Sequence, residues 1–526
     1  MVGAASIVAL FSFLSRIVGL IRDRILLGHF GAGSELDAYY AAFKVPDLVF
    51  SLLVIGSLSA TFIPIFTGHY FGVMSREKAW KFASNTLNIL VIAMIALSVI
   101  VAIFARPFAA LIAPGFDGVQ QTLVADMTRI MLFAQIFLAI SVVFGSMLQS
   151  LKRFLLFSLA PIFYNVGIII GGLWFTEVFG TIGLAWGVVL GAFLHMLVQL
   201  YGALDAGYRW KPILHVTDKD TKEMLRLTGP RMLGIAVNQI NFVVLTIIAT
   251  TLAVGSVTVF QIAYNIQFFA VGIIGVSYAI AVFPQFVEEI ERHDFTKFIS
   301  TFSHAVRHVL FFMIPLTIVF LVLRAQIVRV VAGAGDFDWA STIRTANTLA
   351  FFTFSFVTQS LSLILARVFF AFRDTTTPLI AGLVSALLSL MSALWLSGIF
   401  GVMGLAMAFS IASIVHVVLL WFPLRQRIGS LDELRILKSI YIMISAGLGC
   451  AVVTQFLKPI IVSVIPLDTF VGVLSQGLIA GGAGLMVYTL ICHLFRSEEL
   501  QEIIAGAKRR VLKSSSPKET MTSESI

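Results

Sequence analysis

The segment Gly180-Thr-Ile-Gly-Leu-Ala185 recurs further along the chain as Gly401-Val-Met-Gly-Leu-Ala406. Two more pairs keep nearly the same spacing: Gly56…Phe62-Ile-Pro64 with Gly275…Val282-Phe-Pro284, and Lys152-Arg153 with Arg373-Asp374. Glycine and leucine are common in membrane helices, so each match alone is weak. Three matches at nearly one spacing, however, indicate an internal repeat, as many membrane transporters have.

The composition is that of a protein embedded in lipid. Of the 526 residues, 59% are hydrophobic and only 12% are charged, and the mean hydropathy is +0.99. A soluble domain has about twice that share of charged residues, so this chain cannot cover a water-exposed surface of its size. A disulfide scaffold is excluded as well, because the two cysteines, Cys450 and Cys492, lie far apart in apolar runs.

Runs of about 20 mostly apolar residues, the length that a helix needs to cross a bilayer, occur fourteen times. They are residues 4–28, 37–66, 80–105, 123–150, 154–176, 180–203, 223–252, 257–288, 303–324, 344–370, 376–398, 401–424, 436–457 and 468–494. Six runs fall in each repeat, and an even number brings both copies into the membrane from the same side. The repeat is therefore parallel, about an axis along the membrane normal.

This pattern predicts an all-α polytopic membrane protein with about fourteen transmembrane helices. Two parallel six-helix lobes are expected at residues 1–210 and 222–425, followed by two further helices within residues 436–494. Residues 511–526 are polar and rich in Ser and Thr, so we expect a disordered cytoplasmic tail there.

Basic residues gather in alternate loops, which predicts the orientation in the membrane. With the N-terminus in the cytoplasm, the inner loops carry Arg76, Lys78, Lys81, Lys152, Arg153, Arg209, Lys211, Lys219, Lys222, Arg226, Arg292, Lys297, Arg373, Arg425, Arg427, Arg435 and Lys438. The outer loops carry only Arg106, Arg324, Arg329, Arg344 and Lys458. Both termini are therefore predicted to be cytoplasmic. The basic inner loops account for the net charge of +9. Because these residues are spread over loops that can lie against anionic lipid, no nucleic-acid partner is needed to explain the charge.

Charged residues within the first two spans point to a polar cavity. The first span contains Arg16, Arg22, Asp23 and Arg24, and the second contains Asp37, Lys44 and Asp47. A charge at membrane depth costs about 2.5–3.5 kcal/mol on insertion scales, so such groups face a cavity or one another. Mutual ion pairing near the helix ends is the alternative. Arginine forks suit phosphate oxygens, so this set favours an anionic substrate.

The second lobe offers amides rather than charges. Asn265 lies in the eighth run, where it serves either as a hydrogen-bonding contact between helices or as part of the cavity lining. The residues predicted to bind substrate are Arg16, Arg22, Asp23, Arg24, Asp37, Lys44 and Asn265.

Sequence motifs of hydrolytic or redox chemistry are absent. The chain has no phosphate-binding Walker A loop, no Gly-x-Ser-x-Gly, no His-Glu-x-x-His and no Cys-x-x-Cys. We therefore expect a transporter rather than an enzyme, with no ATPase of its own, no cofactor and no metal site. A coupling ion is left open.

Several segments resemble the MurJ (MviN) lipid II flippases of the MOP superfamily. They are Ser15-Arg-Ile-Val-Gly-Leu-Ile-Arg-Asp23, Phe30-Gly-Ala-Gly33, Ala42-Phe-Lys-Val-Pro46, Ala113-Pro-Gly-Phe116, Leu184-Ala-Trp-Gly187 and Phe369-Phe-Ala-Phe-Arg-Asp-Thr-Thr-Thr-Pro378. The similarity extends over about residues 6–425. It implies a MATE-like fold of two six-helix lobes, with two C-terminal helices forming a groove for the lipid tail.

The resemblance also implies a function. Lipid II, or a related polyprenyl-pyrophosphate glycan, would be moved from the inner to the outer leaflet of the bacterial cytoplasmic membrane by alternating access. Membrane potential or an ion gradient would drive this movement. Arg16, Arg22, Asp37 and Lys44 correspond to the cavity residues of that family. The expected partners are the lipid substrate and membrane lipids, and a monomer suffices for this fold.

The chain departs from the family pattern at several cavity positions. Phe50 and Ser51 stand where the family usually has two arginines, Ile55 stands where it has an acid, and Tyr264-Asn265 replace an Asp-Arg pair. Two alternatives therefore stay open: a MOP-superfamily flippase or exporter for another polyprenyl-linked glycan, and a membrane scaffold that transports nothing.

Overall fold

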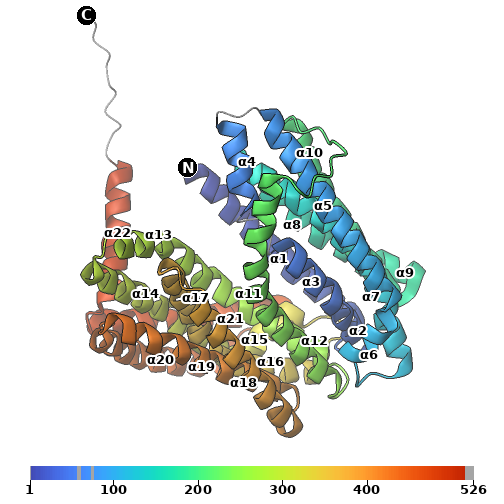
Figure 1. Cartoon of the computed structure of the whole chain (residues 1–526). Helices are drawn as coiled ribbons and strands as arrows, with labels where there is room; N and C mark the ends of the chain where they lie inside the picture. Colours follow the sequence, from blue (N-terminus) through green and yellow to red (C-terminus); the bar gives the residue numbers. More distant parts are fainter. Residues whose placement is uncertain (1, 56–60, 73–75, 516–526) are drawn as a thin grey trace, which may run out of the picture. The chain divides into compact units, whose positions relative to one another are not determined.

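The computed structural model describes residues 2–55, 61–72 and 76–515, and every regular element in this part of the chain is a helix (Figure 1). The predicted all-α fold is thus confirmed. Gly56, which the sequence repeat includes, and the tail residues 516–526 lie outside the described residues. The last helix continues to Ser515, into the segment predicted to be disordered.

The elements follow one another along the chain as a series of long helices, several of them broken. The first half contains α1 (Val2–Phe30), α2 (Ser34–Ala42), α3 (Lys44–Phe50), η1 (Ser51–Ile55), α4 (Phe62–Phe71), α5 (Arg76–Ile103), α6 (Ala105–Ile112), α7 (Gly118–Ser150), α8 (Phe154–Ile170), η2 (Gly171–Phe175), α9 (Thr176–Phe179), η3 (Gly180–Ile182), α10 (Gly183–Asp205) and α11 (Lys219–Thr250). The second half contains α12 (Ser256–Val271), η4 (Gly272–Val276), α13 (Ser277–Glu291), α14 (Phe295–Val322), α15 (Arg324–Ala332), α16 (Trp339–Thr353), α17 (Ser355–Ala371), α18 (Thr376–Phe400), α19 (Val402–Ile428), α20 (Glu433–Val462), α21 (Phe470–Leu494) and α22 (Glu498–Ser515).

Among the described residues the number of membrane spans is lower than the fourteen predicted, although nearly all described residues of the apolar runs lie in helices. By length and composition, nine helical stretches of the described residues can cross a membrane, or ten if α16 and α17, which are bent by 43°, form one span. Four predicted spans are missing from the larger count of ten. Residues Phe154–Asp205 hold two predicted spans in one stretch of 52 residues, and the described residues of the second predicted span are divided among short helices. The first predicted span, on α1, is not among the counted stretches, and of the seventh only Gln239–Thr250 is found, as a shorter apolar helix. The count of fourteen is not confirmed.

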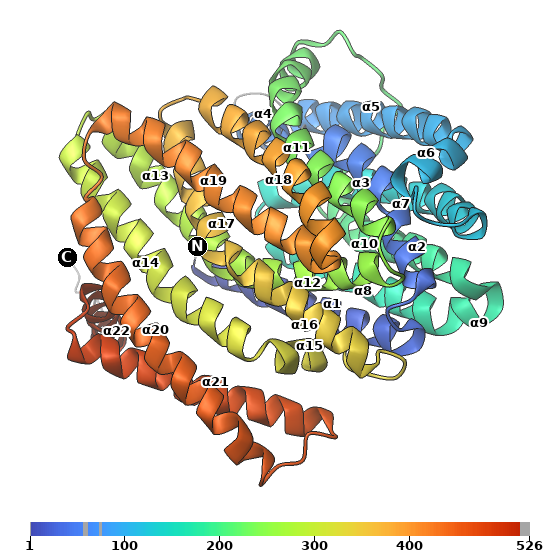
Figure 2. The ribbon, with the colours of Figure 1, turned by 90° about the horizontal axis from the view of Figure 1, so that it is seen from below.

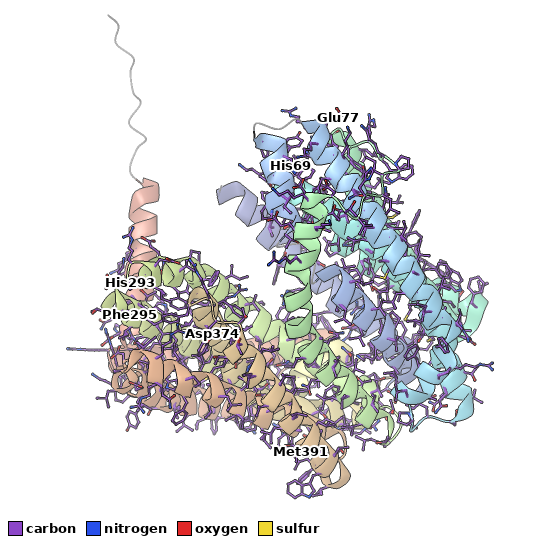
Figure 3. The ribbon with its side chains drawn as sticks, viewed as in Figure 1. His69, Glu77, His293, Phe295, Asp374 and Met391 are labelled. Carbon is purple, nitrogen blue, oxygen red and sulfur yellow. The ribbon has the colours of Figure 1, made fainter. Side chains whose placement is uncertain are left out.

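Lipid-facing side chains agree with a membrane location. Large apolar residues are exposed along whole helices, among them Met391 and Trp395 on α18, which are 69% and 70% exposed. Figure 3 shows Met391 directed away from the neighbouring helices. A water-soluble protein does not expose apolar rows of this extent, so lipid is their solvent.

The sequence repeat reappears in the backbone at the same spacing. Lys152 and Arg373 both have a φ of 60°, and Gly180 and Gly401 have φ values of 62° and 58°. Lys152 and Arg373 each end a helix with the same left-handed turn, in which the next residue donates its N–H to a carbonyl of the preceding turn (Arg153 to Leu148, Asp374 to Phe369). The π-helical segments η1 and η4 begin at positions that match in the same way, Ser51 and Gly272.

Contacts divide the chain into two compact units. The first comprises residues 1–269, 328–352 and 379–412, and the second comprises residues 270–327, 353–378 and 413–526. Residues 222–269 therefore pack with the first unit. The lobe boundaries at residues 210 and 222 remain a prediction.

In the first unit, helices α5, α7, α8 and α10 pack side by side (Figure 1). The segment η2 and helix α10 approach most closely through glycines. A Cβ atom placed on Gly187 would lie 2.6 Å from the Cα of Gly171, a distance that real Cβ atoms do not reach. Glycine is therefore required at positions 171 and 187, because only a residue without a side chain lets the backbones of η2 and α10 come into contact.

We expect Gly187→Ala to destabilise the protein by about 1–3 kcal/mol, because the extra methyl group forces η2 and α10 apart. Thermal unfolding of the purified protein, followed by tryptophan fluorescence, measures the effect. Gly482→Ala on α21 is the matched control, because no atom lies within 4 Å of the added Cβ there. In an open helix, alanine stabilises by up to about 1 kcal/mol relative to glycine. Equal stabilities of the two variants would contradict the prediction.

In the second unit, α14, α20 and α21 pack side by side (Figure 2). Two of these helices are capped at their first turn by polar side chains: Asp294 accepts the N–H of Lys297 at the start of α14, and Thr469 accepts the N–H of Gly472 at the start of α21. The helix α22 follows α21 and is held against this group by ion pairs, which are described below.

Candidate substrate-binding cavity

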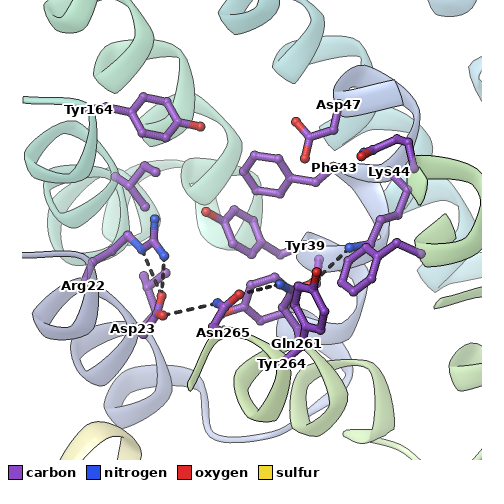
Figure 4. Close-up of a pocket in the computed structure, with 15 residues that line it drawn as sticks. Arg22, Asp23, Tyr39, Phe43, Lys44, Asp47, Tyr164, Gln261, Tyr264 and Asn265 are labelled. Atoms are coloured by element: carbon purple, nitrogen blue, oxygen red, sulfur yellow. Dashed lines mark hydrogen bonds and ion pairs between the residues drawn. The ribbon is translucent and has the colours of Figure 1, made fainter. Parts of the chain in front are cut away.

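Four charged side chains line an internal cavity of about 400 Å³ in the first unit (Figure 4). They are Arg22 and Asp23 from α1, Lys44 from α3 and Asp47 from the same short helix. The lining thus holds two basic and two acidic groups, whose formal charges balance. Helices α2, α8, α11 and α12 complete the walls.

Arg22 is held by two partners in the cavity wall. Its Nε and Nη2 donate to Asp23 Oδ1 at 3.0 and 2.6 Å, and its Nη1 donates to Asn165 Oδ1 at 2.9 Å. Asp23 is only 3% exposed, so its charge needs this partner. The pairing orients the planar guanidinium within the cavity before any substrate arrives.

A chain of hydrogen bonds connects Lys44 with Asp23. Lys44 Nζ donates to Gln261 Oε1 at 2.9 Å, and Gln261 Nε2 donates to Asn265 Oδ1 at 2.9 Å. Asn265 Nδ2 in turn lies 3.5 Å from Asp23 Oδ2. Gln261 and Asn265 are one turn apart on α12, so both amides face the cavity. The two cations of the cavity are therefore connected through two neutral amides and the carboxylate of Asp23 (Figure 4).

Lys44 and Asp47, the two charged residues of α3, each make one further contact with the cavity wall. Lys44 Nζ lies 4.3 Å from the centroid of the Phe242 ring, a cation–π contact. Asp47 accepts a hydrogen bond from Gln135 Nε2 at 3.2 Å. These contacts hold both side chains at the cavity wall.

Aromatic rings make up much of the remaining wall. They belong to Tyr39, Tyr40, Phe43, Tyr164, Phe242 and Tyr264. Tyrosine presents an apolar face and a hydroxyl that both donates and accepts hydrogen bonds. Rings of this kind together with amides suit a ligand that carries sugar hydroxyls as well as charge.

Comparison with known proteins identifies the family. A sequence model of the family described as lipid II flippase MurJ matches residues 28–511, which is most of the chain. The chain belongs to the MurJ family. This finding confirms the resemblance seen in the sequence.

Relatives of the MurJ family match over most of their length. A probable lipid II flippase MurJ of Thermotoga maritima is 27% identical over 94% of this chain and 97% of its own. One of Treponema pallidum is 29% identical over 80% of this chain and 81% of its own. One of Buchnera aphidicola is 27% identical over 83% and 86%.

Solved structures agree on the fold. A structure of lipid II flippase MurJ in an inward closed conformation aligns with a TM-score of 0.75 at 24% identity, covering 93% of this chain and 98% of the other. An inward-facing multidrug resistance MATE family transporter of the MOP superfamily aligns with a TM-score of 0.67 at 16% identity, covering 82% and 99%. The fold of this MurJ-family chain is therefore the MATE-like fold predicted from the sequence.

Of the seven residues predicted to bind substrate, Arg22, Asp23, Lys44 and Asn265 come together in the cavity. Asp37 lies elsewhere: its carboxylate is buried and accepts the N–H groups of Gly255 and Thr258 at 2.7 and 2.8 Å and the Thr258 hydroxyl at 2.7 Å. In this arrangement, Asp37 caps the first turn of α12 from a distant part of the chain.

Arg16 and Arg24 also lie outside the cavity lining. Arg24 donates from Nη1 and Nη2 to three backbone carbonyls at the C-terminal end of α15, those of Arg329, Val330 and Gly333. This contact suits the negative end of a helix dipole. The guanidinium of Arg16 lies 5.8 Å from the centroid of the Phe269 ring. A substrate role for these residues remains a prediction.

The positions that depart from the MurJ pattern fall into two groups. Phe50 packs against the apolar core of the first unit, and Ser51 is buried; neither lines the cavity. Tyr264 and Asn265 do line it, so the missing Asp-Arg pair removes one charge of each sign from the cavity itself.

We expect Asp37→Ala to lower thermal stability strongly, because two N–H groups at the start of α12 lose their buried acceptor at about 1–3 kcal/mol each. Thermal unfolding of the purified variant measures this loss. Thr258→Val, which removes only the hydroxyl contact, should cost about 1 kcal/mol. Normal stability combined with lost transport would instead indicate that Asp37 binds substrate.

Proposed function

We propose that this protein moves lipid II from the inner to the outer leaflet of the bacterial cytoplasmic membrane. The observation that carries the proposal is the placement of Arg22 and Lys44 on one internal cavity, where Gln261, Asn265 and Asp23 connect them by hydrogen bonds. Two cations at separate points suit a pyrophosphate, and the tyrosines and amides suit the attached sugars. Membership of the MurJ family and the names of its relatives support the same substrate.

When the substrate binds, Arg22 would exchange its partner Asp23 for a phosphate of the substrate. Arg22 is already paired with Asp23, so an incoming phosphate competes with that carboxylate. Asp23 then keeps a donor in Asn265, and the amides of the hydrogen-bond chain can rotate to follow. In the empty cavity, Arg22 is paired with Asp23, so its charge is not left without a partner. When an anion binds, it takes the place of that carboxylate.

The lipid tail would stay outside the cavity, in contact with the last two membrane helices. Apolar residues are exposed along α20 and α21, among them Val452, Phe456 and Met486. An open apolar hollow of about 680 Å³ runs along α21. These helices, within residues 436–494, offer an apolar surface for a polyprenyl chain.

The mechanism that we propose is alternating access of the cavity, with six-helix lobes at residues 1–210 and 222–425 and both termini in the cytoplasm. The protein acts as a monomer without an ATPase of its own. The two basic and two acidic side chains of the cavity lining cancel in charge. The net charge of the loaded cavity is therefore that of the anionic head group, and an inside-negative membrane potential favours its export by about 2.3 kcal/mol per charge per 100 mV.

Complementation tests the proposal. The protein is expressed in a bacterium depleted of its own lipid II flippase, and lipid II that has become accessible at the outer face is quantified. Growth and outward accessibility are the expected result. If the folded, membrane-inserted protein restores neither, lipid II is not its substrate, and the same assay with another polyprenyl-linked glycan identifies the alternative.

A further inference from the structure

The helix α22 carries an acidic face that meets a basic face of α14 in the second unit. On α14, His304, Arg307 and His308 share one side of the helix, being separated by about one turn. On α22, Glu498, Glu499 and Glu502 do the same. Arg307 pairs with the first two glutamates, and the two histidines meet the third.

The two histidines converge on one carboxylate oxygen. His304 Nδ1 lies 3.1 Å from Glu502 Oε2, and His308 Nε2 lies 2.8 Å from the same atom. The three potential ligand atoms all lie within 4.8 Å of one another. Within the described part of the chain, this is the only group of three or more His, Cys, Asp or Glu side chains that is compact enough to share one ion.

We propose that His304, His308 and Glu502 bind a divalent transition metal ion, with Zn²⁺ as the preferred occupant. Zinc bonds of about 2.0–2.2 Å to nitrogen and oxygen in a tetrahedron place the ligand atoms about 3.3–3.5 Å apart. The distances of 3.1 and 2.8 Å need to widen only slightly to admit the ion. Two imidazoles and one carboxylate are a zinc ligand set, whereas Ca²⁺ and Mg²⁺ prefer oxygen ligands alone.

The surroundings leave room for a fourth ligand and a path of entry. The side chains of His304, His308 and Glu502 are 39%, 22% and 35% exposed, so a water molecule can complete the tetrahedron. A hollow of about 350 Å³ borders both histidines and is also lined by Tyr278 and Gln285. The ion therefore reaches the site without opening the packed interface.

A metal ion here would fasten α22 to α14. Without the ion, Glu502 contributes two hydrogen bonds to histidines that are partly exposed, which stabilise little. With it, three coordination bonds connect a membrane helix to the helix that follows the last span. The inference is independent of the substrate of the transporter.

Isothermal titration tests the site on the full-length protein, freed of any histidine tag, treated with a chelator and dialysed. With Zn²⁺ as titrant we expect about one ion per chain. His304→Ala, His308→Ala and Glu502→Gln should each weaken binding more than about tenfold, because even the loss of an outer-shell partner costs about 10–100-fold. Circular dichroism establishes that each variant is folded, and Glu502→Gln preserves the shape of the interface.

His293→Asn is the matched control. His293 lies in the turn before α14 (Figure 3) and has a φ of 57°, which asparagine tolerates. This variant should bind Zn²⁺ like the wild type. Zn²⁺ should also slow tryptic cleavage at Lys508 of α22 severalfold in the wild type but not in His308→Ala. Failure of the folded wild type to bind Zn²⁺, or equal affinity in all variants, would overturn the proposal.

Discussion

Replacing Arg22 by alanine is expected to abolish complementation and to reduce the initial rate of lipid II transport by more than about tenfold. Hydrogen bonds between charged groups contribute about 1.5–3 kcal/mol each, and one such bond to the pyrophosphate already corresponds to a factor of about ten. In the empty cavity the three donors of Arg22 are bonded to Asp23 and Asn165, and any of them that exchanges to the pyrophosphate is lost in the variant. Transport per molecule of folded protein in vesicles is the measurement.

The controls for Arg22→Ala separate binding from folding. The substitution leaves Asp23 buried beside Asn265 alone, so some loss of stability accompanies it. Arg22→Ala combined with Asp23→Asn removes both charges and should recover the stability but not the transport. Arg22→Lys, which keeps the charge but loses the fork, should retain partial activity. Full transport by the double variant would mean that Arg22 serves only to neutralise Asp23.

Replacing Arg307 by alanine is expected to release α22 from α14 and to destabilise the second unit by about 3–5 kcal/mol. Arg307 is fully buried, and its Nη1 donates to Glu499 Oε1 at 2.7 Å and to Glu498 Oε2 at 3.0 Å. Glu499 is itself only 1% exposed. Without the arginine, the buried carboxylate of Glu499 loses its charged partner and keeps neutral donors such as the hydroxyls of Ser439 and Ser497.

Thermal unfolding and limited proteolysis of α22 measure the loss of stability caused by Arg307→Ala. The pH dependence of this loss shows whether it comes from the ion pair with Glu499. Burial favours the neutral form of Glu499, but the hydrogen bonds from Ser439, Ser497 and Arg307 hold its pKa below the usual value. A lowered pKa stabilises the folded state above the ordinary glutamate range, and this contribution is lost as the pH falls. The difference between variant and wild type should therefore shrink in acid. A difference that does not change with pH would point to lost packing instead.

Much of the cavity could be predicted because charge inside an apolar run is rare and conspicuous. Arg22, Asp23 and Lys44 stand out in this way, and Asn265 stands out because amides are costly in lipid. The aromatic lining could not be found, because Tyr264 and Phe242 look like any of the 10 tyrosines and 47 phenylalanines in the sequence. Nothing in the spacing tells a cavity ring from a lipid-facing one.

Contacts between distant segments explain the other differences. Asp37 and Arg24 carry the same intramembrane signal as Arg22, but their partners lie in the second half of the chain or close to it, at the start of α12 and in α15. The breaks within the helices could not be predicted from the sequence either. Hydropathy records how apolar a run is, whereas a π-helical turn such as η1 or η4 depends on the hydrogen-bond register.

The matched π-helical segments η1 and η4 have a consequence for how the two repeats arose. A π turn contains one residue more than an α turn, so each marks a single extra residue within a helix. η1 begins at Ser51 and η4 at Gly272, at equal positions of the two repeats, although their sequences, SLLVI and GIIGV, differ. The simplest history is that the extra residue was inserted once, in an ancestral six-helix gene, before that gene was duplicated and fused.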